Sequence, residues 1–107
     1  MRGELWTVAG GVYASKPRPA LIIQEDFFAN TDSVTVLPLT TTALDAPLLR
    51  VPVSVHPGTG LTQQSWVMID KVTTVRRDNL GRLLGRISAE DLVAVERLVT
   101  LFLGLAR

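Results

Sequence analysis

Short apolar segments separated by turn-forming residues occupy most of the chain before residue 88. Residues 4–8 alternate between polar and apolar side chains, which is typical of a strand with one buried face. Residues 19–24 are nearly all apolar, as expected for a strand covered on both faces. By the same criteria, further strands are predicted over residues 33–39, 49–55, 66–69, 72–75 and 83–87. Such close spacing favours a small barrel or a strongly curved antiparallel sheet.

Two prolines and one short polar segment refine this pattern. Pro38 predicts a bulge or an edge near the end of its strand, and Pro52, at an outward position, predicts an edge strand. A single helical turn is predicted at residues 78–80, between two strands.

A longer helix is predicted near the C-terminal end of the chain. Ser88 and Asp91 have the spacing of a capping box, and acidic residues favour a helix N-terminus. Apolar residues then recur at helical spacing until Gly104, which suits a C-terminal stop. The apolar face is wider than one stripe. Two interpretations stay open: one well-buried helix, or a homodimer that buries part of this face.

Composition narrows the possible chemistry. At 107 residues, the chain is expected to form a single domain over residues 1–107. A net charge of +1 excludes nucleic-acid binding through bulk charge, so any such contact requires local clustering. The sequence has no cysteine and one histidine, His56, which excludes disulfides, thiolate zinc sites, cysteine nucleophiles and paired-histidine catalysis. We therefore expect no metal and no cofactor.

No targeting segment is recognisable. Charged residues occupy the positions where a signal peptide needs its apolar core. Residues 92–105 are too short, and too charged at Glu96 and Arg97, to span a bilayer. A soluble cytoplasmic protein without a membrane partner is expected.

Two clusters could carry phosphate chemistry. Arg18 stands between two prolines, beside Lys16, and a guanidinium on a stiff backbone suits a phosphate or a pentacovalent phosphorane. Thr40, Thr41 and Thr42 follow a predicted strand, and their hydroxyls could donate to a phosphoryl oxygen. A solvated basic loop and an ordinary turn explain the same residues.

A third cluster combines amide, hydroxyl and charged side chains suited to contacts with RNA. Its members are Gln63, Gln64, Ser65, Asp70 and Lys71. Trp66 offers a stacking face, but the apolar residues beside it place it in the predicted core.

The order of these clusters resembles that of the MazF/PemK family of toxin–antitoxin endoribonucleases. The matching segments, which cover nearly the whole chain, are residues 2–6 (RGELW), 18–24 (RPALIIQ), 34–41 (VTVLPLTT), 60–61 (GL), 65–68 (SWVM), 80–81 (LG), 85–87 (GRI) and 103–105 (LGL). The resemblance implies a mainly β fold with a C-terminal helix, close to an SH3-like barrel, and a homodimer.

For activity, the resemblance implies metal-independent, ribosome-independent and sequence-specific cleavage of single-stranded RNA. The products would be 2′,3′-cyclic phosphate and 5′-hydroxyl ends, and the consequence would be inhibited translation and growth. A MazE-like antitoxin peptide would cover the RNA groove. The family's catalytic arginine corresponds to Arg18 and its threonine or serine to Thr40, with Thr41 as a substitute one position on. Glu25 and Asp70 are candidates for the group that accepts the 2′ proton.

The sequence also departs from the family pattern. The loop at residues 9–17 is shorter than in many members, and Lys71 and Thr73 stand where relatives often have Gln and Arg. The closest rival within the same fold is a CcdB-like toxin, which binds a DNA topoisomerase without nuclease activity. Those toxins rely on a C-terminal tail with an aromatic residue, whereas this chain ends with residues 103–107 (LGLAR).

Two binding functions without catalysis are also compatible with a small β protein. An SH3-like adaptor would need an exposed aromatic groove, for which one tyrosine and two tryptophans are little material. A non-catalytic RNA-binding module would need a more basic or more aromatic surface than a net charge of +1 suggests.

Overall fold

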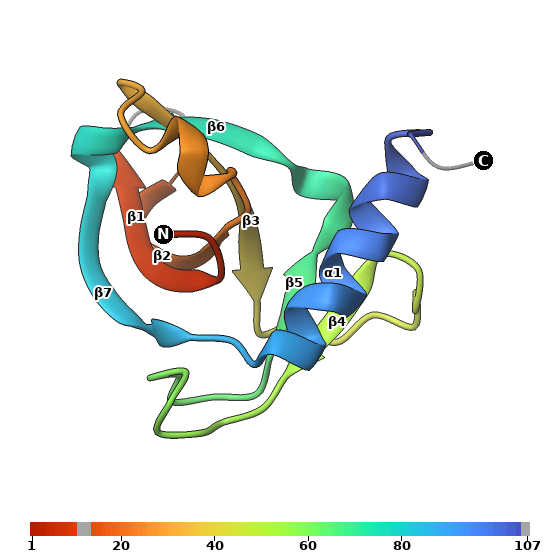
Figure 1. The fold of residues 1–107 in the computed structure, drawn as a ribbon. Helices are drawn as coiled ribbons and strands as arrows, with labels where there is room; N and C mark the ends of the chain where they lie inside the picture. The colour runs from red at the N-terminus through yellow and green to blue at the C-terminus, as the bar shows by residue number, and fades with distance from the viewer. Residues whose placement is uncertain (11–13, 106–107) are drawn as a thin grey trace.

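The computed structural model describes residues 1–10 and 14–105 (Figure 1). Within these residues, seven strands form one antiparallel sheet that one α-helix follows. The strands are β1 (Glu4–Gly10), β2 (Ala14–Ile22), β3 (Ser33–Thr40), β4 (Arg50–Val53), β5 (Ser65–Met68), β6 (Thr73–Arg76) and β7 (Leu80–Arg86). The helix is α1 (Ala89–Phe102), and three 3-10 turns are η1 (Asp26–Phe28), η2 (Ile69–Lys71) and η3 (Arg77–Asn79).

The strand order is β4-β5-β3-β2-β1-β7, and β6 pairs with the first half of β3. In Figure 1, β1, β2, β3, β6 and β7 curve around one end of the molecule, while α1 lies across β4 and β5. The end strands β4 and β7 do not pair in the described part of the chain, so the sheet curves without closing. The predicted mainly β fold with a C-terminal helix is confirmed, in its curved-sheet form.

Two apolar clusters lie on opposite faces of the sheet. Val34 and Val36 of β3 belong to the smaller one, which β1, β2 and β6 complete. Leu37 and Leu39 belong to the larger one, which β4, β5 and α1 help to build. Because side chains alternate along a strand, the buried face of β3 changes between Val36 and Leu37.

Pro52 and Pro38 both lie where the pairing of a strand ends or is interrupted. Pro52 is exposed on β4, which ends the sheet, so the predicted edge strand is confirmed. The predicted edge near the end of β3 is confirmed on one side, because Pro38 is opposite Ala20 in the last β2–β3 pair and β3 has no β2 partner beyond it. Pairing with β6 stops at Val36 and pairing with β5 starts at Leu39. Pro38 lies where η2 separates those two partners, so its missing N–H interrupts no ladder there.

The helix begins as the sequence predicts. The Ser88 side chain accepts a hydrogen bond from the Asp91 N–H at 3.0 Å. Val95 is its buried anchor, whereas Leu101 and Phe102 near its C-terminal end are about half exposed. The interpretation as a single, well-buried helix therefore fits only part of α1, and the homodimer stays a prediction. Among the described residues, no helix is long and apolar enough to cross a membrane.

A close backbone crossing joins the loop after β4 to β7. The Arg86 N–H donates to the Gly58 carbonyl at 2.8 Å. Gly60 has a φ of 69°, and a β-carbon on it would overlap the Leu84 carbonyl. A β-carbon on Gly85 would overlap the Gly58 carbonyl. Gly60 and Gly85, which lie in two of the segments that resemble the family, are thus required because two stretches of backbone touch there.

Replacing either glycine should destabilise the protein. We expect Gly60→Ala, which adds left-handed strain to steric overlap, to lower the free energy of unfolding by at least about 2 kcal/mol. Gly85→Ala, with overlap alone, should cost about 1–3 kcal/mol. The control is Gly58→Ala, where the new methyl group would meet only the exposed His56 ring at 3.0 Å. Urea unfolding curves measure all three, and equal stabilities would contradict the close crossing.

Candidate functional site

Arg18 and Thr40 lie on neighbouring strands and on the same face of the sheet. Arg18 of β2 is directly opposite Val8 of β1, and Thr40 ends β3. Ala20 of β2 is opposite Pro38 of β3. Arg18 and Thr40 each lie two residues beyond this last pair, so both side chains point to the same face of the sheet where β2 and β3 separate. The two residues expected to form the catalytic pair therefore lie on neighbouring strands and on one face of the sheet.

Arg18 lies within strand β2, between Pro17 and Pro19, although a basic loop was one interpretation of this segment. On β2, even-numbered residues bond to β1, as in the 2.8 Å bond from the Gly3 N–H to the Ile22 carbonyl. Odd-numbered residues face β3, as in the 3.3 Å bond from the Ile23 N–H to the Thr35 carbonyl. Pro17 and Pro19 therefore remove donors only on the β3 side.

The pairings of β2 with its two neighbouring strands consequently differ in length. The β1–β2 ladder continues to Ala14, whereas the β2–β3 pairing ends at Ala20. Arg18 and Thr40 flank the point where β2 and β3 separate. Most of the predicted 9–17 loop is therefore strand, and its residues 11–13 lie outside the described residues.

The side chains of the pair are available for a ligand. Arg18 is exposed and has no hydrogen bond or ion pair with the residues that the structure describes. Lys16, two residues before it on the same face, is likewise exposed and unpaired within that part of the chain. The Thr40 Oγ1 accepts a 3.1 Å hydrogen bond from the Thr42 N–H, which leaves its own O–H free to donate. Thr41 is exposed in the same turn.

Trp66 extends this face onto β5. It is directly opposite Thr40, and the exposed Pro52 of β4 is directly opposite Trp66. Trp66 is partly exposed and belongs to neither apolar cluster, so its predicted place in the core is wrong. The neighbouring Val67 points to the other face, where α1 covers the sheet, and is fully buried.

Within the third cluster, two side chains stabilise the local backbone and one is free for a ligand. Ser65 is buried, and its hydroxyl donates to the Gln63 carbonyl at 3.0 Å. The Gln64 side chain donates to the Val53 and Ser65 carbonyls at 3.1 and 3.0 Å. The side chains of Gln64 and Ser65 therefore stabilise the backbone where β5 begins. Gln63 is exposed, and its side chain is not hydrogen-bonded to the described residues.

Asp70 and Lys71 lie in η2, away from the catalytic pair. Asp70 is four residues beyond Trp66, past the end of β5. Its carboxylate accepts a 2.6 Å hydrogen bond from Arg50 and lies 3.8 Å from the Lys71 ammonium. Burial opposes ionisation of Asp70, but the Arg50 hydrogen bond and the nearby positive charges outweigh it and lower its pKa. The other carboxylate considered as a base, Glu25, caps η1 by accepting from the Asp26 N–H.

Comparison with known proteins identifies the family. Residues 1–103 match the family described as PemK-like, MazF-like toxin of type II toxin–antitoxin system. The chain belongs to this family. It is 51% identical to a probable endoribonuclease MazF of Mycolicibacterium smegmatis, over 98% of this chain and 97% of the relative. It is 28% identical to endoribonuclease MazF9 of Mycobacterium tuberculosis, over 97% of this chain and 96% of the relative.

Solved structures agree with this assignment. A mycobacterial endoribonuclease in complex with its cognate antitoxin superposes with a TM-score of 0.83 at 25% identity, over 100% of this chain and 97% of that chain. The Mycobacterium tuberculosis toxin MazF-mt6 gives a TM-score of 0.80 at 28% identity, over 97% of this chain and 99% of that chain.

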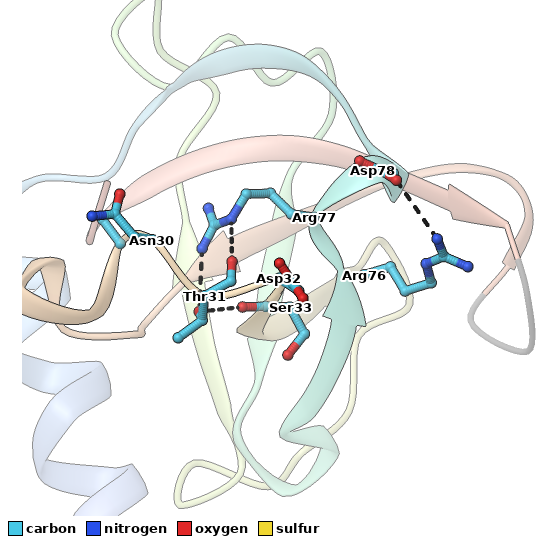
Figure 2. A pocket seen from close by; sticks show the side chains of 8 residues that line it. Asn30, Thr31, Asp32, Ser33, Arg76, Arg77 and Asp78 are labelled. Carbon is cyan, nitrogen blue, oxygen red and sulfur yellow. Dashed lines mark hydrogen bonds and ion pairs between the residues drawn. The ribbon is translucent and has the colours of Figure 1, made fainter.

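The toxin also has a polar pocket of about 640 Å³, far from Arg18 and Thr40. It is lined by residues 29–33 and 76–78, so it lies beside Ser33, at the opposite end of β3 from Thr40 and roughly 23 Å away along the strand. Figure 2 shows the Arg77 guanidinium directed at Thr31, whose carbonyl it meets at 2.8 Å. Arg76 pairs with Asp78 at 3.6 Å. Both arginines are engaged locally, so the pocket is not an extension of the Arg18 surface.

The ion pair between Asp70 and Arg50 should support folding in a pH-dependent way. Asp70→Asn should lower the free energy of unfolding by about 1.5–3 kcal/mol at pH 7, because it leaves Arg50, whose side chain is 10% exposed, without its charged partner. The pKa of Asp70 is lower in the folded state than in the unfolded state. Its contribution is therefore complete above the unfolded value, near about 4, and disappears as the pH falls through the folded value.

Urea unfolding at several pH values between 3 and 7 measures this difference. The gap between wild type and Asp70→Asn should close in acid. Asp45→Asn is the matched control, because Asp45 is exposed between β3 and β4 and has no partner among the described residues. A gap that persists unchanged at low pH would contradict the role of the charge.

Proposed function

We propose that this toxin is an endoribonuclease that cleaves single-stranded RNA, with Arg18 and Thr40 at the scissile phosphate. The observation that carries the proposal is an exposed guanidinium with no protein partner in the described chain, on the same sheet face as Thr40. The names of the relatives, endoribonuclease MazF and MazF9, support this reaction class.

RNA itself supplies the nucleophile. The 2′-oxygen attacks the adjacent phosphorus, a 2′ O–P bond forms, and the bond from phosphorus to the 5′-oxygen breaks. The products are a 2′,3′-cyclic phosphate and a 5′-hydroxyl; one proton leaves the 2′-oxygen and one reaches the 5′-oxygen. The protein has to align the groups and stabilise the charge that develops on the phosphorane.

Arg18 and Thr40 suit this task. The planar guanidinium can donate two hydrogen bonds to the non-bridging oxygens, and it stays charged at neutral pH. The Thr40 hydroxyl, held by the Thr42 N–H, can donate to the same phosphate. Lys16 adds a second positive charge on this face, and Gln63 is available for contacts with the RNA. Thr41, exposed in the turn, is a second hydroxyl close to the phosphate.

The proposal extends to partners. One structural relative is an endoribonuclease in complex with its cognate antitoxin, which supports a MazE-like peptide as the inhibitor of this toxin. Such a peptide, if acidic, would neutralise Arg18 and Lys16 and block the RNA groove. The half-exposed end of α1 suits a homodimer. Cleavage of cytoplasmic RNA would inhibit translation and growth without the ribosome or a metal taking part.

Substitution of the pair should abolish cleavage without unfolding the protein. With purified protein and a long single-stranded RNA in EDTA, wild type should give discrete fragments with 5′-hydroxyl ends. Arg18→Ala should reduce kcat by about 10²–10³-fold, as for other residues that stabilise a charged transition state. Thr40→Ala should cost about 10- to 100-fold, the effect of one hydrogen bond to a charged group.

Arg82→Ala is the matched control, because it removes an exposed arginine from β7 and leaves the proposed site intact. Urea unfolding curves establish that each variant is folded. Intact RNA after incubation of folded wild type with several varied substrates would overturn the proposal. Binding to a DNA topoisomerase would then be measured, since it distinguishes a CcdB-like toxin.

A further inference from the structure

The two tryptophans of the toxin occupy contrasting environments. Trp6 packs against the smaller apolar cluster, and its indole N–H donates to Glu4 at 3.1 Å. Trp66 packs in neither cluster, and its indole N–H has no hydrogen bond within the described chain. Trp66 is thus a large aromatic side chain that is partly exposed and whose polar group is unused. Such side chains contact ligands that have both an apolar face and polar edges.

Trp66 is also in register with the proposed site. It is directly opposite Thr40 of β3 on one side and Pro52 of β4 on the other, and Arg18 lies on the same face of β2, two residues beyond the last β2–β3 pair. Residues directly opposite on neighbouring strands lie on one face, and successive strands are about 4.8 Å apart. Trp66 is therefore one strand from Thr40, and Arg18 lies on the strand beyond Thr40.

The surroundings of Trp66 fix its position. The backbone of β5 is paired on both sides, with β3 and with β4. Pro52, which has a rigid ring, lies directly across from it, and Val67 anchors β5 in the core below. An aromatic ring on a paired strand, directly opposite a residue that binds the phosphate, can stack on a nucleobase with little loss of conformational entropy.

We propose that Trp66 is a base-stacking residue of the RNA-binding surface, binding the nucleobase next to the phosphate that Arg18 and Thr40 hold. This inference rests on the proposed nuclease function. Stacking tolerates every base, because each has a π-face, so Trp66 contributes to affinity and alignment for all substrates. The cleavage motif is set by other contacts.

Kinetics of Trp66 variants test this role. Trp66→Ala should raise KM about 10-fold or more, the usual effect of removing one stacking partner, and leave the cleavage positions unchanged. Trp66→Phe keeps an aromatic face and should recover most of the affinity. An equal loss in both variants, or a changed cleavage motif with normal KM, would overturn the proposal. Trp6→Phe is the matched control and should leave KM unchanged.

A binding measurement gives a readout independent of cleavage. The probe is a dye-labelled RNA oligonucleotide of a cleaved sequence whose 2′-hydroxyls carry methyl groups, so that it lacks the nucleophile. In Trp6→Phe protein, Trp66 is the only tryptophan, and its fluorescence should be quenched in parallel with the rise in probe anisotropy. In Trp66→Phe protein, the Trp6 signal should stay constant on binding.

The outcomes separate the two proposals. Binding without quenching of Trp66, together with active cleavage, would overturn the stacking role and leave the nuclease function standing. No binding of the probe by folded wild type, together with no cleavage of RNA, would overturn both. Quenching that saturates with the anisotropy supports the stacking role. Far-ultraviolet circular dichroism establishes that Trp6→Phe and Trp66→Phe are folded.

Discussion

The rest of the structure depends on the change of buried face along β3. Consecutive side chains on a strand point to opposite faces, yet Val36 and Leu37 are both fully buried. The first half of β3 buries one face in the smaller apolar cluster, and the second half buries the other face beneath α1. The face left open in the second half carries Thr40, and a shift of one residue would send Thr40 beneath the helix and expose Leu39. Core packing therefore fixes which side chains can meet a substrate.

Prolines make this arrangement possible by ending pairings where the site needs space. Pro19 lacks the N–H that would continue the β2–β3 ladder, whereas the β1–β2 ladder passes it undisturbed. Arg18 thus lies on a strand that is paired on one side and open on the other. Strand positions hold side chains more accurately than loops, which suits a reaction in which alignment and charge stabilisation are the main contributions of the protein. The same residues look like a flexible basic loop when only their sequence is considered.

Local patterns predicted the helix start at Ser88 and the edge strand at Pro52, because both depend on residues close in sequence. The expectation that Arg18 and Thr40 share one site came from the family resemblance, since no spacing rule reveals which distant strands become neighbours. Trp66 was misassigned because an apolar run is compatible with burial on both faces, whereas α1 covers only one. The partner of Asp70 is twenty residues away in sequence, which local analysis does not detect.

Charge pairing explains how a chain of net charge +1 can present a basic site. Many of its arginines are engaged within the fold, by carboxylates or by backbone carbonyls: Arg2, Arg50, Arg76, Arg77 and Arg86. Arg18 and Lys16 are exposed without such partners in the described chain, as are Arg82 and Arg97, and the open face of β2 therefore carries two free cations two residues apart. A site with few free cations releases few counterions when it binds RNA, so its affinity depends only weakly on salt. The remaining affinity has to come from uncharged contacts, which is the contribution that an aromatic ring beside the phosphate supplies.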